Sequence, residues 1–228
     1  TMKAATFGED AEQVAKHVVA MKRGFHDGGV LAMGKHFPGY GSIATDAHKG
    51  TAHIVKSVED VEKEDMVPFK ALIDDGVDGI MMGHVIVDAI DPKYPATLSE
   101  TLVKGYVREK LGFDGIIMTD AMRMKAIQDN YGTGPASVMA VQAGCNMVLL
   151  RGDMNHFKEG YDAILTAAKN GEISEETLDT CVKRILKAKE DAGLFEQYNV
   201  DYIYYPHAER WNFKPDQAWF SENCSLVY

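Results

Sequence analysis

Short apolar segments alternate with amphipathic segments along most of the chain, and this alternation constrains the fold more than any other feature. Four segments have the composition of short strands: residues 30–37, 79–85, 115–119 and 147–150. The stretches between them place apolar residues three and four positions apart, which is the helical spacing. Strands that alternate with helices predict parallel βα units, so the predicted fold class is α/β.

Capping and breaking residues delimit the predicted helices. Ser57 and Asp60 have the spacing of a capping box, Pro68 interrupts the helix that follows, and Gly76 and Gly112 stand where helices end. The predicted helices cover residues 9–25, 57–75, 99–111, 124–127, 135–143, 156–169 and 174–192.

Residues 34–50, GKHFPGYGSIATDAHKG, combine titratable groups with four glycines. Lys35 and His36 stand at the end of the first predicted strand, and proline and glycine then break the strand into a loop. Polar groups at a strand end followed by a loop are typical of an active site. Asp46 and His48 are two residues apart, so in extended backbone their side chains leave on the same side and the carboxylate orients the imidazole.

Composition excludes several classes of partner. The formal net charge of -10 repels phosphate backbones and there is no basic cluster, which argues against nucleic acid binding and favours an uncharged or weakly charged substrate. No run approaches about 18 apolar residues, so no membrane span is predicted, and the first ten residues lack a signal-like apolar region. Three unpatterned cysteines predict free buried thiols.

The motifs KHFPGYG and TDAH, with IIMTDAM at residues 116–122, together resemble glycoside hydrolase family 3, and most closely its bacterial β-N-acetylglucosaminidase branch. The resemblance runs from about Thr6 to Leu194. It implies a TIM (β/α)8-type barrel of which this chain holds about the second half, four βα units. Ala5 stands where the family has a sugar-binding arginine, and the strands that precede it in the family do not appear in this sequence.

The resemblance also implies roles for the polar residues. Asp120 corresponds to the nucleophile, His48 to the general acid/base with Asp46 behind it, and no metal or organic cofactor is implied. Lys35 and His36 resemble ligands of sugar hydroxyls. His84 ends an apolar strand and is a further candidate for binding substrate.

Each residue also has a purely structural interpretation from its local sequence. Asp120 has the position of an N-cap for a helix that starts at Ala121. Lys35 fits a lysine that extends its charge to solvent, and His84 fits a hydrogen-bonded core histidine.

The expected function is therefore a retaining glycoside hydrolase that removes terminal β-linked N-acetylglucosamine. Three alternatives stay open: a family 3 β-glucosidase-like hydrolase, an inactive half-barrel that only binds sugar or a partner chain, and a hydrolase whose divalent metal is held by His36, His48, His84 and Asp120.

Domain organisation is predicted as a half-barrel over residues 1–194 and an aromatic-rich tail over residues 195–228. The tail holds both tryptophans and five of the ten tyrosines, a composition that predicts packing on the domain or on a partner. A half-barrel exposes two sheet edges, so self-association or pairing with the missing barrel half is expected.

Overall fold

The structure is a computed structural model that describes residues 6–43 and 51–195. The chain divides into two compact units, residues 1–188 and 189–228, and the architecture below is that of the first unit. Asp46, His48 and the tail from residue 196 lie outside the described residues.

Seven α-helices, five strands and three other helical segments are described in those ranges. The α-helices are α1 (Ala11–Asp27), α2 (Val58–Asp60), α3 (Val67–Asp74), α4 (Lys125–Gln128), α5 (Thr133–Ala143), α6 (Met154–Lys169) and α7 (Glu175–Asp191). The strands are β1 (Met33–Phe37), β2 (Ala52–Ile54), β3 (Gly79–Met82), β4 (Val85–Val87) and β5 (Ile116–Thr119). Two π-helices, η2 (Val61–Asp65) and η4 (Thr101–Lys110), and a 3₁₀ turn, η3 (Ala96–Leu98), complete the list.

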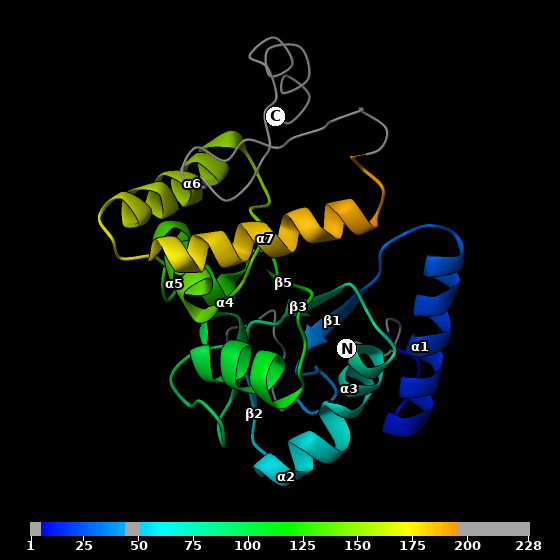
Figure 1. Ribbon diagram of the computed structural model, residues 1–228. Coiled ribbons are helices and arrows are strands. Elements are labelled where there is room, and N and C mark those ends of the chain that lie inside the picture. Colours follow the sequence, from blue (N-terminus) through cyan, green and yellow to red (C-terminus); the bar gives the residue numbers. More distant parts are fainter. Residues whose placement is uncertain (1–5, 44–50, 196–228) are drawn as a thin grey trace. The chain divides into compact units, whose positions relative to one another are not determined.

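The central sheet has the order β1-β3-β5, and both pairings are parallel. This confirms the predicted α/β class, and Figure 1 shows the three strands together with helices around them. Residues 79–85 do not form one strand, which corrects the prediction. β3 ends at Met82, and after Gly83 and His84 the chain continues as β4, which pairs in parallel with β2 in a separate sheet.

The predicted strand at residues 147–150 is also wrong as a regular strand. The segment follows β5, but the two share only one isolated bridge, between Met118 and Met147. The Asn146 side chain accepts a hydrogen bond from the Ile117 backbone N–H at 2.9 Å, and the Thr119 hydroxyl accepts one from the Leu149 N–H at 2.9 Å. These two side chains take part in the pairing beside backbone bonds such as the one from the Thr119 N–H to the Met147 carbonyl at 3.1 Å, so the contact with β5 is not a regular ladder.

The predicted helices are found, with differences at their ends. Asp10 caps α1 by accepting a hydrogen bond from the Gln13 N–H at 2.8 Å. Ser57 caps α2 as the capping-box spacing predicted, and Pro68 lies in the first turn of α3, where its missing N–H costs no helical hydrogen bond. The segment 57–75 is therefore three consecutive helical pieces, α2, η2 and α3.

The core lies between the central sheet and its helices. Phe37, the last residue of β1, is fully buried and meets the Phe69 ring of α3 edge-on, with centroids 5.3 Å apart. Other fully buried apolar side chains come from the strands and from the segments that cover them: Ile54, Val61, Ile80, Met82, Val85, Val87, Leu102, Ile117, Met122 and Ile127.

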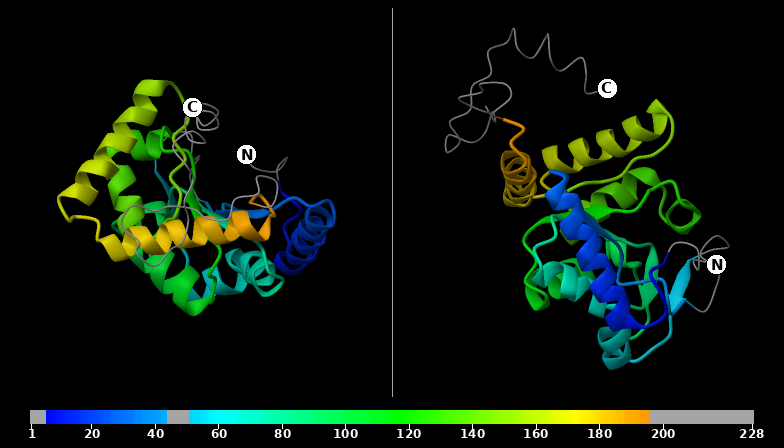
Figure 2. Two further views of the ribbon diagram at one scale, coloured as in Figure 1. Left: turned by 45° about the horizontal axis from the view of Figure 1, so that its top comes forward. Right: turned by 90° about the vertical axis from the view of Figure 1, so that its right-hand side faces the viewer.

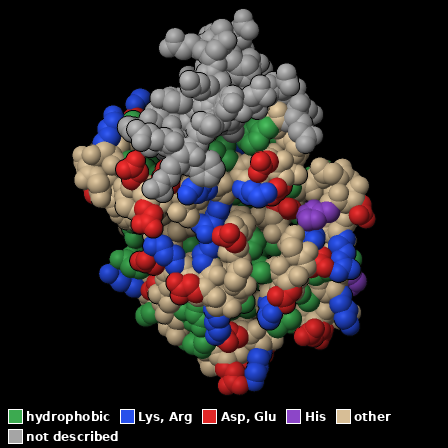
Figure 3. All heavy atoms as spheres, in the orientation of Figure 1, with side chains coloured by type: hydrophobic (Ala, Val, Ile, Leu, Met, Phe, Trp, Pro, Cys, Tyr) green, Lys and Arg blue, Asp and Glu red, His purple; other side chains and the backbone are tan. Residues whose placement is uncertain are grey.

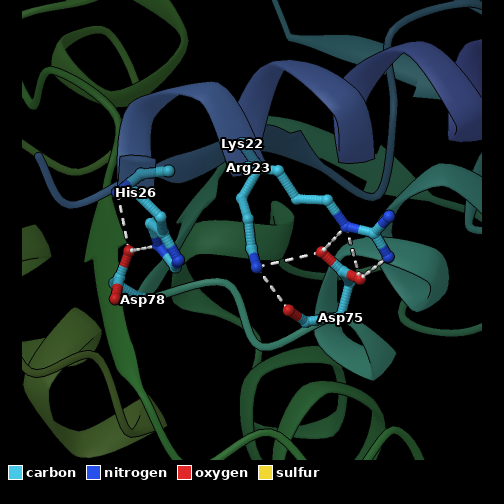
Figure 4. A network of polar contacts seen from close by, with 6 residues as sticks. Lys22, Arg23, His26, Asp75 and Asp78 are labelled. Carbon is cyan, nitrogen blue, oxygen red and sulfur yellow. Dashed lines mark hydrogen bonds and ion pairs between the residues drawn. The ribbon is translucent and has the colours of Figure 1, made fainter. Parts of the chain in front are cut away.

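Helix α1 is fastened to the end of α3 by charged groups (Figure 4). Lys22 is 7% exposed, and its ammonium lies 2.9 Å from the Asp75 carboxylate and also donates to the Asp75 carbonyl. Arg23 binds the same carboxylate from the solvent side, and these hydrogen bonds hold the pKa of Asp75 well below its usual range. One helical turn after Lys22, Nε2 of His26 lies 2.7 Å from Oδ2 of Asp78. Figures 1 and 2 show α1 and α3 side by side.

Acidic and basic side chains are intermingled on the face seen in Figure 3, without a continuous basic patch among the residues described there. Within residues 6–43 and 51–195, no helix has the length and apolar character needed to cross a membrane. Cys145 and Cys181 are free and buried, as predicted, and burial raises the pKa of the Cys145 thiol to about 12. Cys224 lies outside the described residues.

Candidate active site

Polar side chains from three parallel strands meet at one edge of the central sheet. His36 lies near the end of β1, His84 follows β3, and Asp120 follows β5 directly. Because the strands are parallel, their carboxyl ends lie together, and the Asp120 N–H donates to the Met82 carbonyl at 3.0 Å across this edge. In parallel α/β folds this edge carries the active site.

The two carboxylate oxygens of Asp120 have different surroundings. Oδ1 accepts a hydrogen bond from the Ala121 N–H at 2.7 Å, whereas Oδ2 lies 3.5 Å from His36 Nε2, longer than a normal hydrogen bond. The side chain is 14% exposed. One oxygen is therefore anchored and the other faces a polar neighbour without a close bond, as a nucleophilic carboxylate requires.

The N-cap interpretation of Asp120 is wrong. Residues 121–124 form a turn, and α4 begins only at Lys125 with Met124 as its N-cap. The bond from Ala121 is a contact with the next residue, not a helix cap.

His36 lies against Asp120 and an aromatic ring. Its ring centroid is 5.0 Å from that of Tyr40, which belongs to the loop after β1. Burial lowers the pKa of His36, and the Lys35 charge adds to this effect, while the Asp120 charge partly opposes both. His36 is therefore neutral near pH 7 and contacts Asp120 as a neutral imidazole.

Tyr40 connects two parts of the site. Its hydroxyl accepts a hydrogen bond from the His84 N–H at 3.1 Å, and burial together with the Asp120 charge raises its pKa to about 12. A Cβ on Gly83 would lie 2.9 Å from the Tyr40 hydroxyl oxygen, so only glycine leaves room for this contact.

His84 is 2% exposed, and both of its ring nitrogens face protein oxygen atoms. Nε2 lies 3.0 Å from the Ala121 carbonyl, and Nδ1 lies 2.8 Å from the Thr97 hydroxyl. Burial lowers the pKa of His84, so the ring carries one proton near neutral pH. A carbonyl only accepts, so Nε2–H donates to the Ala121 carbonyl, while Nδ1 lies against the Thr97 hydroxyl, which also lies 2.8 Å from the Gly83 carbonyl. His84 thereby holds the turn that carries Asp120.

The remaining predicted site residues are divided between described and undescribed parts of the chain. Lys35 is exposed on β1 next to His36. Asp46 and His48 lie in residues 44–50, which the structure does not describe, so their roles stay predictions. No group of three or more His, Cys, Asp or Glu side chains that could hold a metal ion occurs among the described residues.

Sequence reasoning missed Tyr40 and Thr97. Tyr40 stands inside the motif KHFPGYG, where an aromatic residue next to a strand end was a usable signal. Thr97 had no such signal, because its contact with His84 is set by the turn η3.

Comparison with family models and with known proteins identifies the family of this chain. The family model for the glycosyl hydrolase family 3 N terminal domain matches residues 2–188. The chain belongs to glycosyl hydrolase family 3. This membership identifies the parallel βα units as part of a TIM-barrel-like domain, as predicted.

Several relatives of this family 3 chain carry names or known structures. A beta-hexosaminidase of Nitrosomonas eutropha is 41% identical over 162 residues, which are 71% of this chain and 45% of that protein. A family 3 beta-N-acetylglucosaminidase from Paenibacillus sp. FPU-7 superposes with a TM-score of 0.81 at 38% identity, over 83% of this chain and 36% of that one. The beta-glucoside phosphorylase BglX superposes with a TM-score of 0.78 at 28% identity, over 85% of this chain and 36% of that one. The chain spans about half the length of the curated relatives it matches.

The lowered pKa values of His36 and His84 predict a pH-dependent stability. An unfolded histidine takes up a proton near pH 6.5, whereas the folded chain resists protonation at both positions. The stabilising contribution is therefore complete above about pH 6.5 and is lost as the pH falls toward 5. Each histidine adds a slope of up to about 1.4 kcal/mol per pH unit to the free energy of unfolding.

Urea unfolding between pH 7.5 and 5 measures this slope. His84→Gln lowers the stability at pH 7.5 and makes the slope shallower. Gln13 is exposed on α1 and has no titratable side chain, so Gln13→Ala serves as the control and leaves the slope unchanged. An equal slope in wild type and His84→Gln contradicts the prediction.

Proposed function

We propose that this family 3 chain carries the catalytic residues of a retaining glycoside hydrolase that releases terminal β-linked N-acetylglucosamine. The observation that supports it best is the position of Asp120, which follows β5 with one oxygen anchored to Ala121 and the other facing His36. The names of its relatives, beta-hexosaminidase and beta-N-acetylglucosaminidase, point to the sugar.

The reaction has two steps. In the first, an oxygen of Asp120 attacks the anomeric carbon and forms a glycosyl ester, while the bond to the leaving oxygen breaks and His48 gives that oxygen a proton. In the second, His48 removes a proton from water, the water oxygen attacks the anomeric carbon, and the Asp120 carboxylate is released. Asp46 orients the His48 ring. No step needs a metal or organic cofactor.

The described residues have supporting roles in this proposal. Lys35 and His36 bind sugar hydroxyls, because both lie at the carboxyl end of β1 and His36 is next to Asp120. His84 was predicted to bind substrate, but both of its ring nitrogens are engaged by protein atoms, so we assign it to holding the Ala121 turn.

The contribution of His48 and Asp46 is tested by substitution. Both His48→Ala and Asp46→Ala slow turnover of aryl β-N-acetylglucosaminides, and His48→Ala by about 10²–10³-fold, the range for general acid–base catalysis. Azide restores part of the rate and gives a β-glycosyl azide, because azide attacks the glycosyl ester without needing a base. Unchanged turnover in both variants contradicts their assignment.

Two further substrates separate the alternatives. Preference for an aryl β-glucoside over the amino sugar favours a β-glucosidase-like enzyme, and phosphate-dependent release of a sugar phosphate favours a phosphorylase such as the structural relative BglX. No turnover of any substrate by the chain favours an inactive half-barrel. Pairing with a second copy, or with the rest of a barrel, stays a prediction.

A further inference from the structure

One buried carboxylate outside the sheet edge contacts the chain on both sides of residues 44–50. Asp65 is the last residue of η2, and its side chain is only 4% exposed. On one side of the segment, the Ser42 hydroxyl lies 2.7 Å from Oδ1 and 2.9 Å from Oδ2. On the other side, the Lys56 ammonium lies 3.3 Å from Oδ2. Ser42 and Lys56 are 14 positions apart in the chain and thus contact the same carboxylate.

The backbone of the loop after β1 is shaped around the same residue. Gly39 has a φ of +130°, and a Cβ there would lie 3.3 Å from both the Cβ and the carbonyl oxygen of Asp65. This φ is one that side-chain-bearing residues rarely adopt. The chain therefore passes close to Asp65 at Gly39, between His36 and Tyr40, before it reaches Ser42.

The contact with Lys56 has a second member. Glu64 also accepts a hydrogen bond from the Lys56 ammonium, but its side chain is 61% exposed. Burial alone would lower the pKa of Lys56, but the hydrogen bonds and charges of Glu64 and Asp65 outweigh it and raise the pKa. Lys56 is thus charged at neutral pH. Asp65 is the buried partner of this lysine and the only one of the two carboxylates in contact with Ser42 among the described residues.

We infer that Asp65 is a positioning residue whose carboxylate joins the two flanks of the segment that carries Asp46 and His48. Fixing both ends of a segment reduces the conformations open to it, so less entropy is lost when its side chains adopt a reactive geometry. The inference rests on the proposed function for its catalytic consequence. The tether between the flanks is independent of that function.

The tether itself is tested by hydrogen exchange on the 228-residue chain. Asp65→Asn removes the charge that holds Lys56 and weakens the bond to Ser42, so amides in residues 38–43 and 51–57 exchange about tenfold faster, as loss of a charge-assisted hydrogen bond implies. Ser42→Ala accelerates only residues 38–43, and Ser42→Thr restores the wild-type rate. Glu64→Gln is the matched control and changes neither flank by more than about twofold. Unchanged exchange in Asp65→Asn overturns the tether.

The positioning role is tested with leaving groups of different acidity. Proton donation matters most when the leaving group is poor, so Asp65→Asn lowers kcat/KM about tenfold more for an alkyl than for a dinitrophenyl β-N-acetylglucosaminide. A general loss of folded protein lowers both equally, and that result overturns the positioning role while the exchange data still decide the tether. If wild type turns over neither substrate, the positioning role falls together with the proposed function, and faster exchange in Asp65→Asn still supports the tether.

Discussion

Replacing Asp120 with asparagine is expected to lower kcat for aryl β-N-acetylglucosaminides by at least about 10⁴-fold, the scale seen when an enzyme loses its nucleophile. Asparagine has the same shape, and its amide oxygen keeps the hydrogen bond from the Ala121 N–H. The substitution therefore removes the negative charge and the nucleophilicity but leaves the turn in place. Steady-state kinetics with wild type and Asp120→Asn measure the effect.

The same strand offers the control. Asp114 precedes β5, so it lies at the amino end, away from the candidate site, and its side chain is 85% exposed and paired with Arg184. Asp114→Asn is expected to change kcat by less than about twofold, because an exposed ion pair contributes little. Wild type quenched during turnover should also carry a glycosyl adduct on the peptide that contains Asp120. More than a tenth of wild-type activity in Asp120→Asn would assign the nucleophile to another residue.

Phe37→Ala is expected to lower the free energy of unfolding by about 3–5 kcal/mol, the usual cost of removing a buried aromatic ring. Phe37 is fully buried, and its loss leaves a cavity against Phe69 that the strand cannot close, because β1 is held by its pairing with β3. The measurement is urea unfolding followed by both circular dichroism and fluorescence, to establish that the transitions coincide.

Phe157→Ala is the matched control for this loss. Phe157 is 47% exposed on α6 and stacks on Tyr161 at a centroid distance of 6.2 Å. Alanine has the higher helix propensity, which offsets part of the lost contact, so the expected change is below about 1 kcal/mol. Equal destabilisation by the two substitutions would contradict the assignment of Phe37 to the core.

The features that local sequence determines were predicted well. Hydrophobic spacing located α1, α5, α6 and α7, and the parallel arrangement followed from the alternation of strands with helices. Because parallel strands end at one edge, the meeting of His36 with Asp120 was also predictable from the ends of their strands. The family motifs added the expected chemistry, which the spacing alone left open.

The features that depend on distant contacts were not predicted. β2 and β4 are paired strands of only three residues each, which is too short to show a hydrophobic period in the sequence. The segment after β5 has the composition of a strand, but the Asn146 side chain takes the Ile117 N–H that a regular neighbour would bind. Asp65 looks like one more acidic residue in a charged helix, and only the fold shows that it contacts both Ser42 and Lys56.

The middle strand of the sheet sets the spacing between the two outer ones. β1 and β5 have no direct pairing, since each bonds to β3, so the backbones of these two strands lie two interstrand spacings apart, about 9.6 Å. β3 itself ends at Met82, two residues before the polar side chain of His84. Substitutions that bulge or twist β3 are therefore a way to alter the separation of the two groups while every residue at the sheet edge keeps its identity, which makes this strand a target for tuning the site through its scaffold.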